Sequence, residues 1–358
     1  MEKRSREPMF HIVKRNGIST KFAWLVRICA IAAALLLCAL IFFLLAHKSP
    51  IEFYKAMIDG AFGSARRIWL MLYELAILLC IALAITPAFK MRFWNIGAEG
   101  QVMVSGLACA ACMFYLGGKV PNPALWAIMI VTSIAAGIVW AVIPAFFKAN
   151  WNTNETLFTL MMNYVATQLV LFCINTWVTS GSGTLPPMSK YGLPTVYNDW
   201  LLNIILVAVL TVAIYIYQRF SKHGYELAVV GESQNTARYI GINVKKVIIR
   251  TMVLSGAVCG VAGLILVGGT DHTIATTTVG GRGFTAIMVS WLAKFNPIFM
   301  VLTSFLIAFL ERGAQQVSTT FRINDSISDI ITAVILFFII GCEFFINYKI
   351  MLTRKEDK

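Results

Sequence analysis

The sequence predicts an all-α protein that crosses a membrane about ten times. Hydrophobic residues make up 58% of its 358 positions, whereas charged residues make up only 13%, and the mean hydropathy is +0.75. Apolar runs long enough to cross a bilayer also recur along the whole chain. A water-soluble globular protein does not combine these properties, so the chain is predicted to be a polytopic membrane protein.

The first predicted span is the unbroken apolar run 28–46. At about 1.5 Å per residue, such a run crosses roughly 30 Å of hydrocarbon. A cleavable signal peptide is the alternative, but the run exceeds a typical signal-peptide core and no small-residue cleavage site follows it. The later spans of full length are predicted at residues 68–86, 93–115, 124–147, 157–178, 201–217, 251–269 and 329–348.

Shorter features lie between these spans. Phe53, Ala56 and Met57 recur at helical spacing, which predicts an interfacial helix between the first two spans. The second span is expected to end at Pro87. In the segment 148–156, an Asn or Thr side chain is expected to cap the helix that follows.

Residues 284–310 contain two short apolar pieces, 284–293 and 298–310, separated by K-F-N-P. Each piece is too short for a comfortable span, which predicts a pair of shortened or broken helices. Such discontinuities lie in protein-lined cavities rather than against lipid. Residues 311–328 are then expected to form an external linker.

The distribution of positive charge predicts the orientation of the chain. The net charge is +13, and Lys and Arg concentrate in residues 1–21, 219–250 and 349–358. Because positive residues stay on the cytosolic side, both termini and the segment 219–250 are predicted to be cytosolic, and residues 22–348 form the transmembrane domain. This topology signal accounts for the charge, so no nucleic-acid partner is expected.

A polar stretch, N-I-G-A-E-G-Q, opens the third predicted span. Its Asn95, Glu99 and Gln101 are costly in lipid and are tolerated where they face other protein groups or a water-filled path. Both interpretations stay open, because the same side chains can simply join helices. Glu74 and Glu99 could also form the proton route of a secondary transporter, although no intramembrane Lys, Arg or His is obviously paired with them.

A faint internal repeat relates the two halves of the chain. Met103–Leu107 reads M-V-S-G-L and Met288–Leu292 reads M-V-S-W-L, and each follows a glycine-containing stretch. Two halves of about five spans each would have opposite orientations. The pattern predicts inverted five-helix repeats with a pathway at their interface.

Motifs of catalysis do not occur in the sequence. It has no G-x-x-x-x-G-K-S/T phosphate loop, no H-E-x-x-H and no G-x-S-x-G, and its four histidines are scattered. The cysteines lie in or beside apolar runs, which is typical of core residues. An enzyme, a metal site and a bound cofactor are therefore not expected in this chain.

Four separated stretches carry a resemblance to a known family. They are N-I-G-A-E-G-Q (Asn95–Gln101), N-E-T-L-F-T-L-M-M-N-Y (Asn154–Tyr164), V-G-E-S-Q-N-T-A-R-Y-I-G-I (Val230–Ile242) and G-R-G-F-T-A-I (Gly281–Ile287). Together they resemble the permease subunits of ABC importers for simple sugars and nucleosides, a family related to the branched-chain amino acid permeases. The chain looks closest to the longer of the two permeases that pair in bacterial nucleoside importers.

The resemblance implies the assembly in which the chain works. The permease would lie in the lipid of the bacterial plasma membrane and pair with a related shorter permease, although a homodimer stays open. Separate ABC ATPase subunits would bind ATP and Mg²⁺, and an extracellular lipoprotein would capture the substrate. The implied cargo is a nucleoside. The alternatives are a simple sugar such as ribose, a branched-chain amino acid and, in another class, ion-coupled secondary transport.

Motif matching also implies a coupling element at Tyr225–Ile242. Gly231 and Gly241 would bound a short cytosolic helix, whose Ala237 and Ile240 face would enter a groove of the ATPase. The residues assigned to ATPase coupling are Tyr225, Gly231, Glu232, Ala237, Ile240, Gly241 and Ile242.

The substrate pathway is assigned to polar and aromatic residues of the predicted spans. They are Trp94, Asn95, Glu99, Gln101, Asn163, Phe284 and Trp291. Amide and carboxylate groups would hydrogen-bond to hydroxyls, and aromatic side chains would cover a ring face. This mixture suits a neutral ring that bears hydroxyls.

Overall fold

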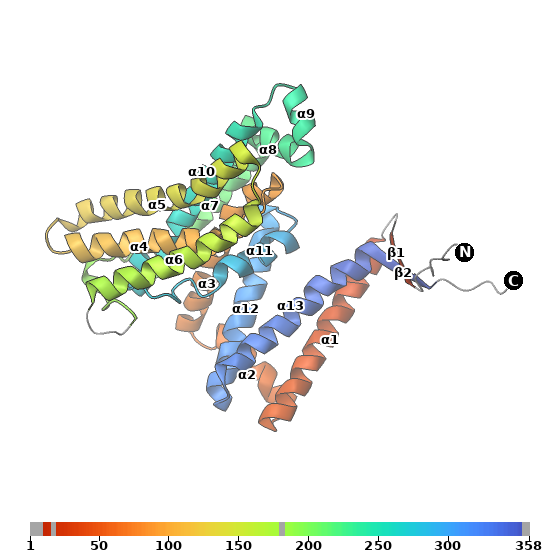
Figure 1. The fold of residues 1–358 in the computed structure, drawn as a ribbon. Helices are drawn as coiled ribbons and strands as arrows, with labels where there is room; N and C mark the ends of the chain where they lie inside the picture. Colours follow the sequence, from red (N-terminus) through yellow and green to blue (C-terminus); the bar gives the residue numbers. More distant parts are fainter. Residues whose placement is uncertain (1–9, 16–18, 179–182, 353–358) are drawn as a thin grey trace, which may run out of the picture. The chain divides into compact units, whose positions relative to one another are not determined.

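The computed structural model describes residues 10–15, 19–178 and 183–352 (Figure 1). This part of the chain is almost entirely helical, which confirms the predicted all-α membrane fold. It divides into two compact units, one formed by residues 1–67 with 309–358 and the other by residues 68–308. We call them the terminal unit and the central unit.

In the terminal unit, a pair of long helices brings the two ends of the described chain together. α1 (Thr20–Ala46) packs beside α13 (Asp325–Asn347) (Figure 1). β1 (Phe10–Lys14), just before α1, pairs antiparallel with β2 (Tyr348–Leu352), just after α13. The two strands therefore lie at the same end of this unit.

α2 (Pro50–Phe62) is the helix that the sequence predicts between the first two spans, and its position at the membrane interface stays a prediction. The Ser49 hydroxyl caps it by accepting a hydrogen bond from the Ile51 N–H at 3.3 Å. Phe53 packs against Phe42 of α1, with ring centroids 5.1 Å apart. The buried face of α2 consists of Phe53, Ala56, Met57, Gly60 and Ala61.

The central unit contains most of the other helices. In chain order they are α3 (Ala65–Lys90), α4 (Ala98–Leu116), α5 (Asn122–Trp151), α6 (Glu155–Trp177), α7 (Leu201–Phe220), α8 (Lys222–Glu232), α9 (Gln234–Tyr239), α10 (Val244–Leu264), α11 (Arg282–Leu292) and α12 (Pro297–Phe321). A 3-10 turn, Ser189–Tyr191, and a π-helical extension of α10, Ile265–Asp271, complete the set. α3 begins and α12 ends in the terminal unit.

The core of the central unit is the packing of α10 against α4 and α5 (Figure 1). Glycines spaced four apart on α10 predict such close contact. A Cβ atom added to Gly256 would lie 2.4 Å from the Gly137 carbonyl oxygen, and one added to Gly260 would lie 2.6 Å from the Ile134 Cα. The backbones therefore meet with no room for a side chain, as predicted.

Among the described residues, nine helices are long and apolar enough to cross a membrane. They are α1, α3, α4, α5, α6, α7, α10 with its extension, α12 and α13. α12 corrects the prediction, because residues 298–310 and 311–321 form one continuous helix rather than a short helix and an external linker. Glu311 and Arg312 interrupt the apolar run, so hydropathy predicted that the span ends there. The helix continues past them, because its backbone hydrogen bonds do not require apolar side chains.

Two helix ends also differ from the prediction. α3 continues through Pro87, because proline removes one backbone hydrogen bond but its φ is compatible with a helix. α10 begins at Val244, well before residue 251, since the Asn243 side chain caps it. The cap predicted in front of α6 is confirmed at Asn154, whose side chain accepts a hydrogen bond from the third residue after it.

α11 is a short helix, as predicted. Its 11 residues rise about 16 Å, roughly half of a hydrocarbon core. Residues 272–281, which precede it, pair with another linker, where the Leu185 N–H donates to the Ile274 carbonyl at 3.2 Å. Residues 294–297, which follow it, line one pocket together with Arg219 at the end of α7. The chain thus runs along α10 from the end where α7 ends and returns toward that end along α11, and a tenth crossing stays a prediction.

Candidate functional site

Buried side-chain amides hold the turn between α3 and α4. The Asn95 side-chain oxygen accepts hydrogen bonds from the Gly97 N–H at 3.1 Å and from the Gln101 amide at 3.1 Å. The Asn95 amide donates to the Ser255 hydroxyl of α10 at 3.2 Å. Both amide side chains are buried. Because a buried polar group is tolerated only when it is hydrogen-bonded, this network fixes the turn that leads into α4.

Asn163 of α6 holds the same turn between α3 and α4. Its side-chain oxygen accepts a hydrogen bond from the Gly100 N–H at 2.9 Å, and its amide donates to the Ile96 carbonyl at 3.0 Å. One side chain therefore pairs with a backbone N–H that the start of α4 leaves without an intrahelical acceptor, and with a backbone carbonyl of the turn before α4.

Glu99 joins α4 to α11. Its carboxylate accepts hydrogen bonds from the Gly281 N–H at 2.8 Å and from the Gly283 N–H at 2.7 Å, and only 9% of the residue is exposed. Gly281 has φ +79, a left-handed conformation that favours glycine. A carboxylate is stabilised at a helix N-terminus by the free N–H groups and the helix dipole. Glu99 thus anchors the start of α11.

Arg282 forms an ion pair with Glu74 of α3 that the sequence analysis missed. The guanidinium Nη2 lies 2.9 Å from Glu74 Oε2, and Nε lies 3.1 Å from the same oxygen. The two residues are 208 positions apart, and Arg282 belongs to a G-R-G motif in a polar segment. The structure therefore supplies Glu74 with the cationic partner that was not evident from the sequence.

Three aromatic residues of the predicted pathway are exposed. Trp94 is 43% exposed and Trp291 is 49% exposed, and their ring centroids lie 5.3 Å apart. Phe89 packs on both tryptophans, at 5.7 Å and 6.5 Å. Phe284 is also exposed, although no ring contact joins it to these three. Trp94 and Trp291 thus form an exposed aromatic surface on the central unit, and they pack on the buried ring of Phe89.

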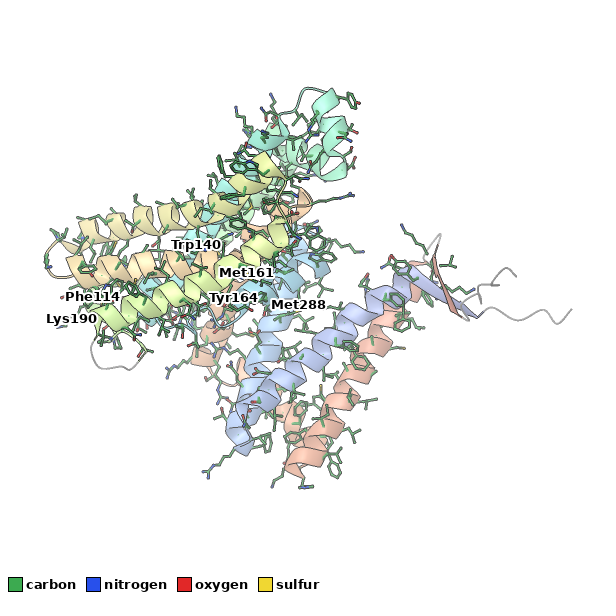
Figure 2. The ribbon with its side chains drawn as sticks, viewed as in Figure 1. Phe114, Trp140, Met161, Tyr164, Lys190 and Met288 are labelled. Atoms are coloured by element: carbon green, nitrogen blue, oxygen red, sulfur yellow. The ribbon has the colours of Figure 1, made fainter. Side chains whose placement is uncertain are left out.

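The predicted pathway residues therefore fall into two groups. The four polar ones, Asn95, Glu99, Gln101 and Asn163, are buried and hydrogen-bonded to other protein groups, whereas the three aromatic ones remain exposed. Met161 and Tyr164 of α6 are exposed as well, and they were not assigned to the pathway (Figure 2). The assignment of these residues to a substrate pathway stays a prediction.

The predicted coupling segment folds into two helices, α8 and α9. Ser221 caps α8 by accepting a hydrogen bond from the Gly224 N–H at 2.9 Å, and Ser233 caps α9 by accepting one from the Thr236 N–H at 3.2 Å. The helices therefore break at Ser233. α9 is the short helix predicted between Gly231 and Gly241, but Ser233 rather than Gly231 marks its start, and the residues before it form a separate helix, α8.

Gly231 and Gly241 each have a structural role that the sequence analysis did not assign. Gly231 lies within α8, where an added Cβ would be 2.1 Å from the Lys90 carbonyl oxygen, so it permits close packing. Gly241 follows α9 with φ +84, which favours glycine at the turn into α10.

Ala237 corrects the predicted contact face. It is 0% exposed and packs in an apolar cluster with Leu227, Val230 and Val244, so it holds α9 to the central unit. Ile240 is exposed, and Tyr239, which the prediction omitted, is 91% exposed. Tyr239 and Ile240 are therefore the exposed large apolar side chains of α9 and its C-terminal cap. Of the other coupling residues, Tyr225 and Glu232 are exposed and Ile242 is partly buried.

Residues 68–340 match the family described as branched-chain amino acid transport system / permease component. The chain belongs to this family. The match runs from α3 into α13 and covers more than half of the permease.

Curated relatives of the permease agree with this family. It is similar to the glucose ABC transporter permease protein TsgB13 of Haloferax volcanii, with 25% identity over 85% of this chain and 84% of the relative. It is also similar to the guanosine ABC transporter permease protein NupP of Bacillus subtilis, with 29% identity over 80% and 84%. The nucleoside ABC transporter permease protein NupB of Lactococcus lactis shows 26% identity over 88% and 90%. The permease is therefore of the ABC importer type for simple sugars and nucleosides, as its sequence motifs implied.

Replacing Glu99 by glutamine is expected to destabilise the permease. The amide nitrogen cannot accept a hydrogen bond, so one buried N–H at the start of α11 loses its partner, at about 1–3 kcal/mol. The measurement is the midpoint of thermal unfolding of the purified permease. Glu52→Gln, at an exposed carboxylate of α2, is the control. An unchanged midpoint together with reduced uptake would contradict the anchoring role and favour a substrate contact.

Proposed function

We propose that this permease imports nucleosides and that α8 and α9 couple it to a separate ATPase. The observation that carries the coupling proposal is the pair Tyr239 and Ile240, which project from a short helix whose other face is fixed by buried Ala237. Exposed aromatic and aliphatic side chains on a helix that is held in place by packing are typical of interaction hot spots.

The choice of nucleosides rests on chemistry and on relatives. Two similar permeases carry the words guanosine and nucleoside in their names, whereas a third is named for glucose. The exposed rings of Trp94 and Trp291 offer ring faces to a base, and stacking on aromatic rings favours a nucleobase over a simple sugar. A simple sugar such as ribose and a branched-chain amino acid are the alternative cargoes.

The proposed assembly has several subunits. This permease pairs with a second, related permease, and separate ABC ATPase subunits bind ATP and Mg²⁺ and supply the energy. An extracellular lipoprotein delivers the substrate. The assembly lies in the bacterial plasma membrane with both termini of this chain and α8–α9 in the cytosol, which the charge distribution supports.

The coupling proposal is tested by replacing Tyr239 with alanine. Removing a hot-spot tyrosine costs about 2 kcal/mol of association, so ATPase binding should weaken roughly thirtyfold. Uptake of labelled guanosine should fall accordingly, while the amount of permease in the membrane stays constant. Phe220→Ala, at an exposed aromatic residue that ends α7, is the matched control. Normal uptake and normal ATPase co-purification in the Tyr239 variant would contradict the assignment.

The cargo is tested separately in cells with and without the permease gene. Loss of guanosine or uridine uptake on deletion, unaffected by excess ribose or leucine, would support a nucleoside importer. Competition by ribose or leucine would favour those cargoes instead. Uptake that continues without an ATPase partner and stops with an uncoupler would indicate an ion-coupled transporter.

A further inference from the structure

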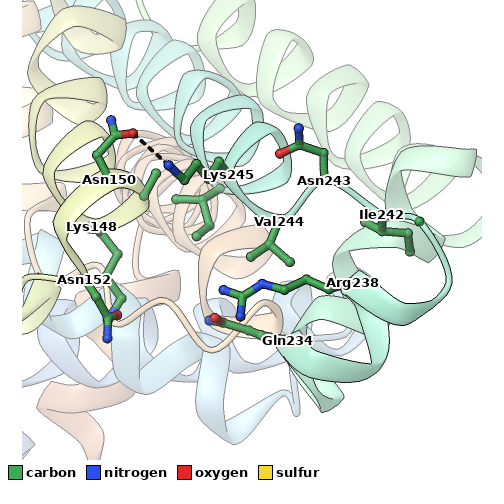
Figure 3. A pocket seen from close by; sticks show the side chains of 12 residues that line it. Lys148, Asn150, Asn152, Gln234, Arg238, Ile242, Asn243, Val244 and Lys245 are labelled. Atoms are coloured by element: carbon green, nitrogen blue, oxygen red, sulfur yellow. Dashed lines mark hydrogen bonds between the residues drawn. The ribbon is translucent and has the colours of Figure 1, made fainter.

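A basic pocket of about 770 Å³ lies where α5 ends and where α9 and α10 meet (Figure 3). Figure 3 shows side chains of α5 on one side of it and side chains of α9 on the other. Its charged and amide lining includes Lys148, Asn150, Asn152, Arg238, Asn243 and Lys245. All of its lining residues are described, and none of them is acidic. The pocket therefore combines positive charge with hydrogen-bond donors.

Two of its positive charges lack an acidic partner in the described part of the chain. Lys148 forms an ion pair with Glu155 at 2.8 Å. The Lys245 ammonium donates to the Asn150 side-chain oxygen at 3.3 Å, and the Arg238 guanidinium to that of Asn235 at 3.5 Å. Neutral amides leave both charges in place, so the pocket can bind an anion.

Aromatic residues locate this pocket at the membrane surface. Phe146, Phe147 and Trp151, at the end of α5, are exposed and pack together, with Trp151 ring centroids 5.7 Å and 5.4 Å from the two phenylalanines. Tryptophan and other aromatic residues at the end of a membrane span mark the depth of lipid headgroups. Lys148 lies within this aromatic segment, so we expect the pocket to lie at the depth of the headgroup phosphates.

An apolar groove of about 390 Å³ adjoins the pocket along the chain. It begins at Thr153, the residue after Asn152 of the pocket, and continues along α6. Its α6 lining is Leu157, Phe158, Met161, Met162 and Val165, and Figure 2 shows Met161 on this helix. A basic pocket followed by an apolar groove matches a ligand with a phosphate and a hydrocarbon chain.

We propose that the pocket binds the phosphate headgroup of an anionic phospholipid, with an acyl chain in the groove on α6. Basic pockets between spans at a membrane surface bind such headgroups by charge and hydrogen bonding. Tyr239 and Ile240, the residues proposed to contact the ATPase, do not line the pocket. Gly241 and Ile242, which motif matching also assigns to coupling, do line it, so the lipid and the ATPase would contact neighbouring parts of this segment. A bound lipid would brace α9 against α5.

The test measures phospholipid binding to the delipidated full-length permease, with its co-purified subunits, by native mass spectrometry. The probes are phosphatidylglycerol, phosphatidylcholine, inorganic phosphate and glycerophosphoglycerol, which has the headgroup without acyl chains. The pocket variant is Arg238→Gln with Lys245→Gln. The control variant is Lys222→Gln with Lys246→Gln, which removes two positive charges from exposed positions outside the pocket.

Phosphatidylglycerol should bind the native permease more tightly than phosphatidylcholine, and the pocket variant should lose about twentyfold in this affinity. The control should lose about threefold or less. Equal losses in both variants would overturn the proposal in favour of diffuse attraction. Binding of inorganic phosphate or glycerophosphoglycerol as tight as that of the lipid would overturn the phospholipid assignment. Unchanged lipid binding with loss of a co-purified ATPase would assign the pocket to a protein interface.

Discussion

Replacing Arg282 by glutamine is expected to destabilise the permease by about 3 kcal/mol or more, because the Glu74 carboxylate would remain buried without its cation. The side chains of Arg282 and Glu74 are only 25% and 12% exposed, and the guanidinium makes two or more contacts with the carboxylate. Chemical unfolding of the purified permease measures the effect. Glu74→Gln combined with Arg282→Gln should recover part of the loss, since the Glu74 carboxylate no longer needs a cation.

Arg67→Gln is the matched control for this prediction. Arg67 pairs with Asp59 in the terminal unit, and both side chains are at least one-third exposed. An exposed ion pair contributes about 0–1 kcal/mol, so this variant should unfold almost like the native permease. Equal losses of unfolding free energy in Arg282→Gln and Arg67→Gln would show that the Arg282–Glu74 pair does not hold α11 in the position seen in the structure.

Replacing Gly256 by leucine is expected to prevent the permease from folding. A Cβ atom at this position would lie 2.4 Å from the Gly137 carbonyl oxygen and 2.7 Å from the Ala141 Cβ. The clash involves backbone, which cannot rotate away as a side chain can, so α5 and α10 would have to separate. The yield of monodisperse protein after solubilisation measures the effect, and Gly256→Ala should show a smaller loss in the same direction.

Gly341→Leu is the control for this prediction. Gly341 also lies within a predicted span, but a Cβ atom there meets nothing within 4 Å. Leucine is a better helix former than glycine, by up to about 1 kcal/mol, so this variant should accumulate like the native permease. Normal yield of the Gly256 variant would show that α10 does not pack on α5 at this distance.

Local features of the fold followed from the sequence alone. Apolar length predicted the spans, and helical spacing predicted the buried face of α2. An Asn or Thr of residues 148–156 was predicted to cap α6, because capping depends on neighbouring residues, and the structure shows that Asn154 does so. The shortness of α11 was also predicted. The inverted repeat stays a prediction, although its two motifs lie in α4 and α11, which Glu99 joins.

The sequence by itself also determined the class of protein, because hydropathy and the four family motifs do not depend on contacts between distant residues. Only the tertiary structure decided what individual polar and apolar side chains do. It buried Ala237 while leaving Tyr239 open, paired Arg282 with Glu74, and directed Glu99 to the start of α11. Each of these outcomes depends on which helix lies beside which, and residues far apart in the chain carry no local signal of that packing.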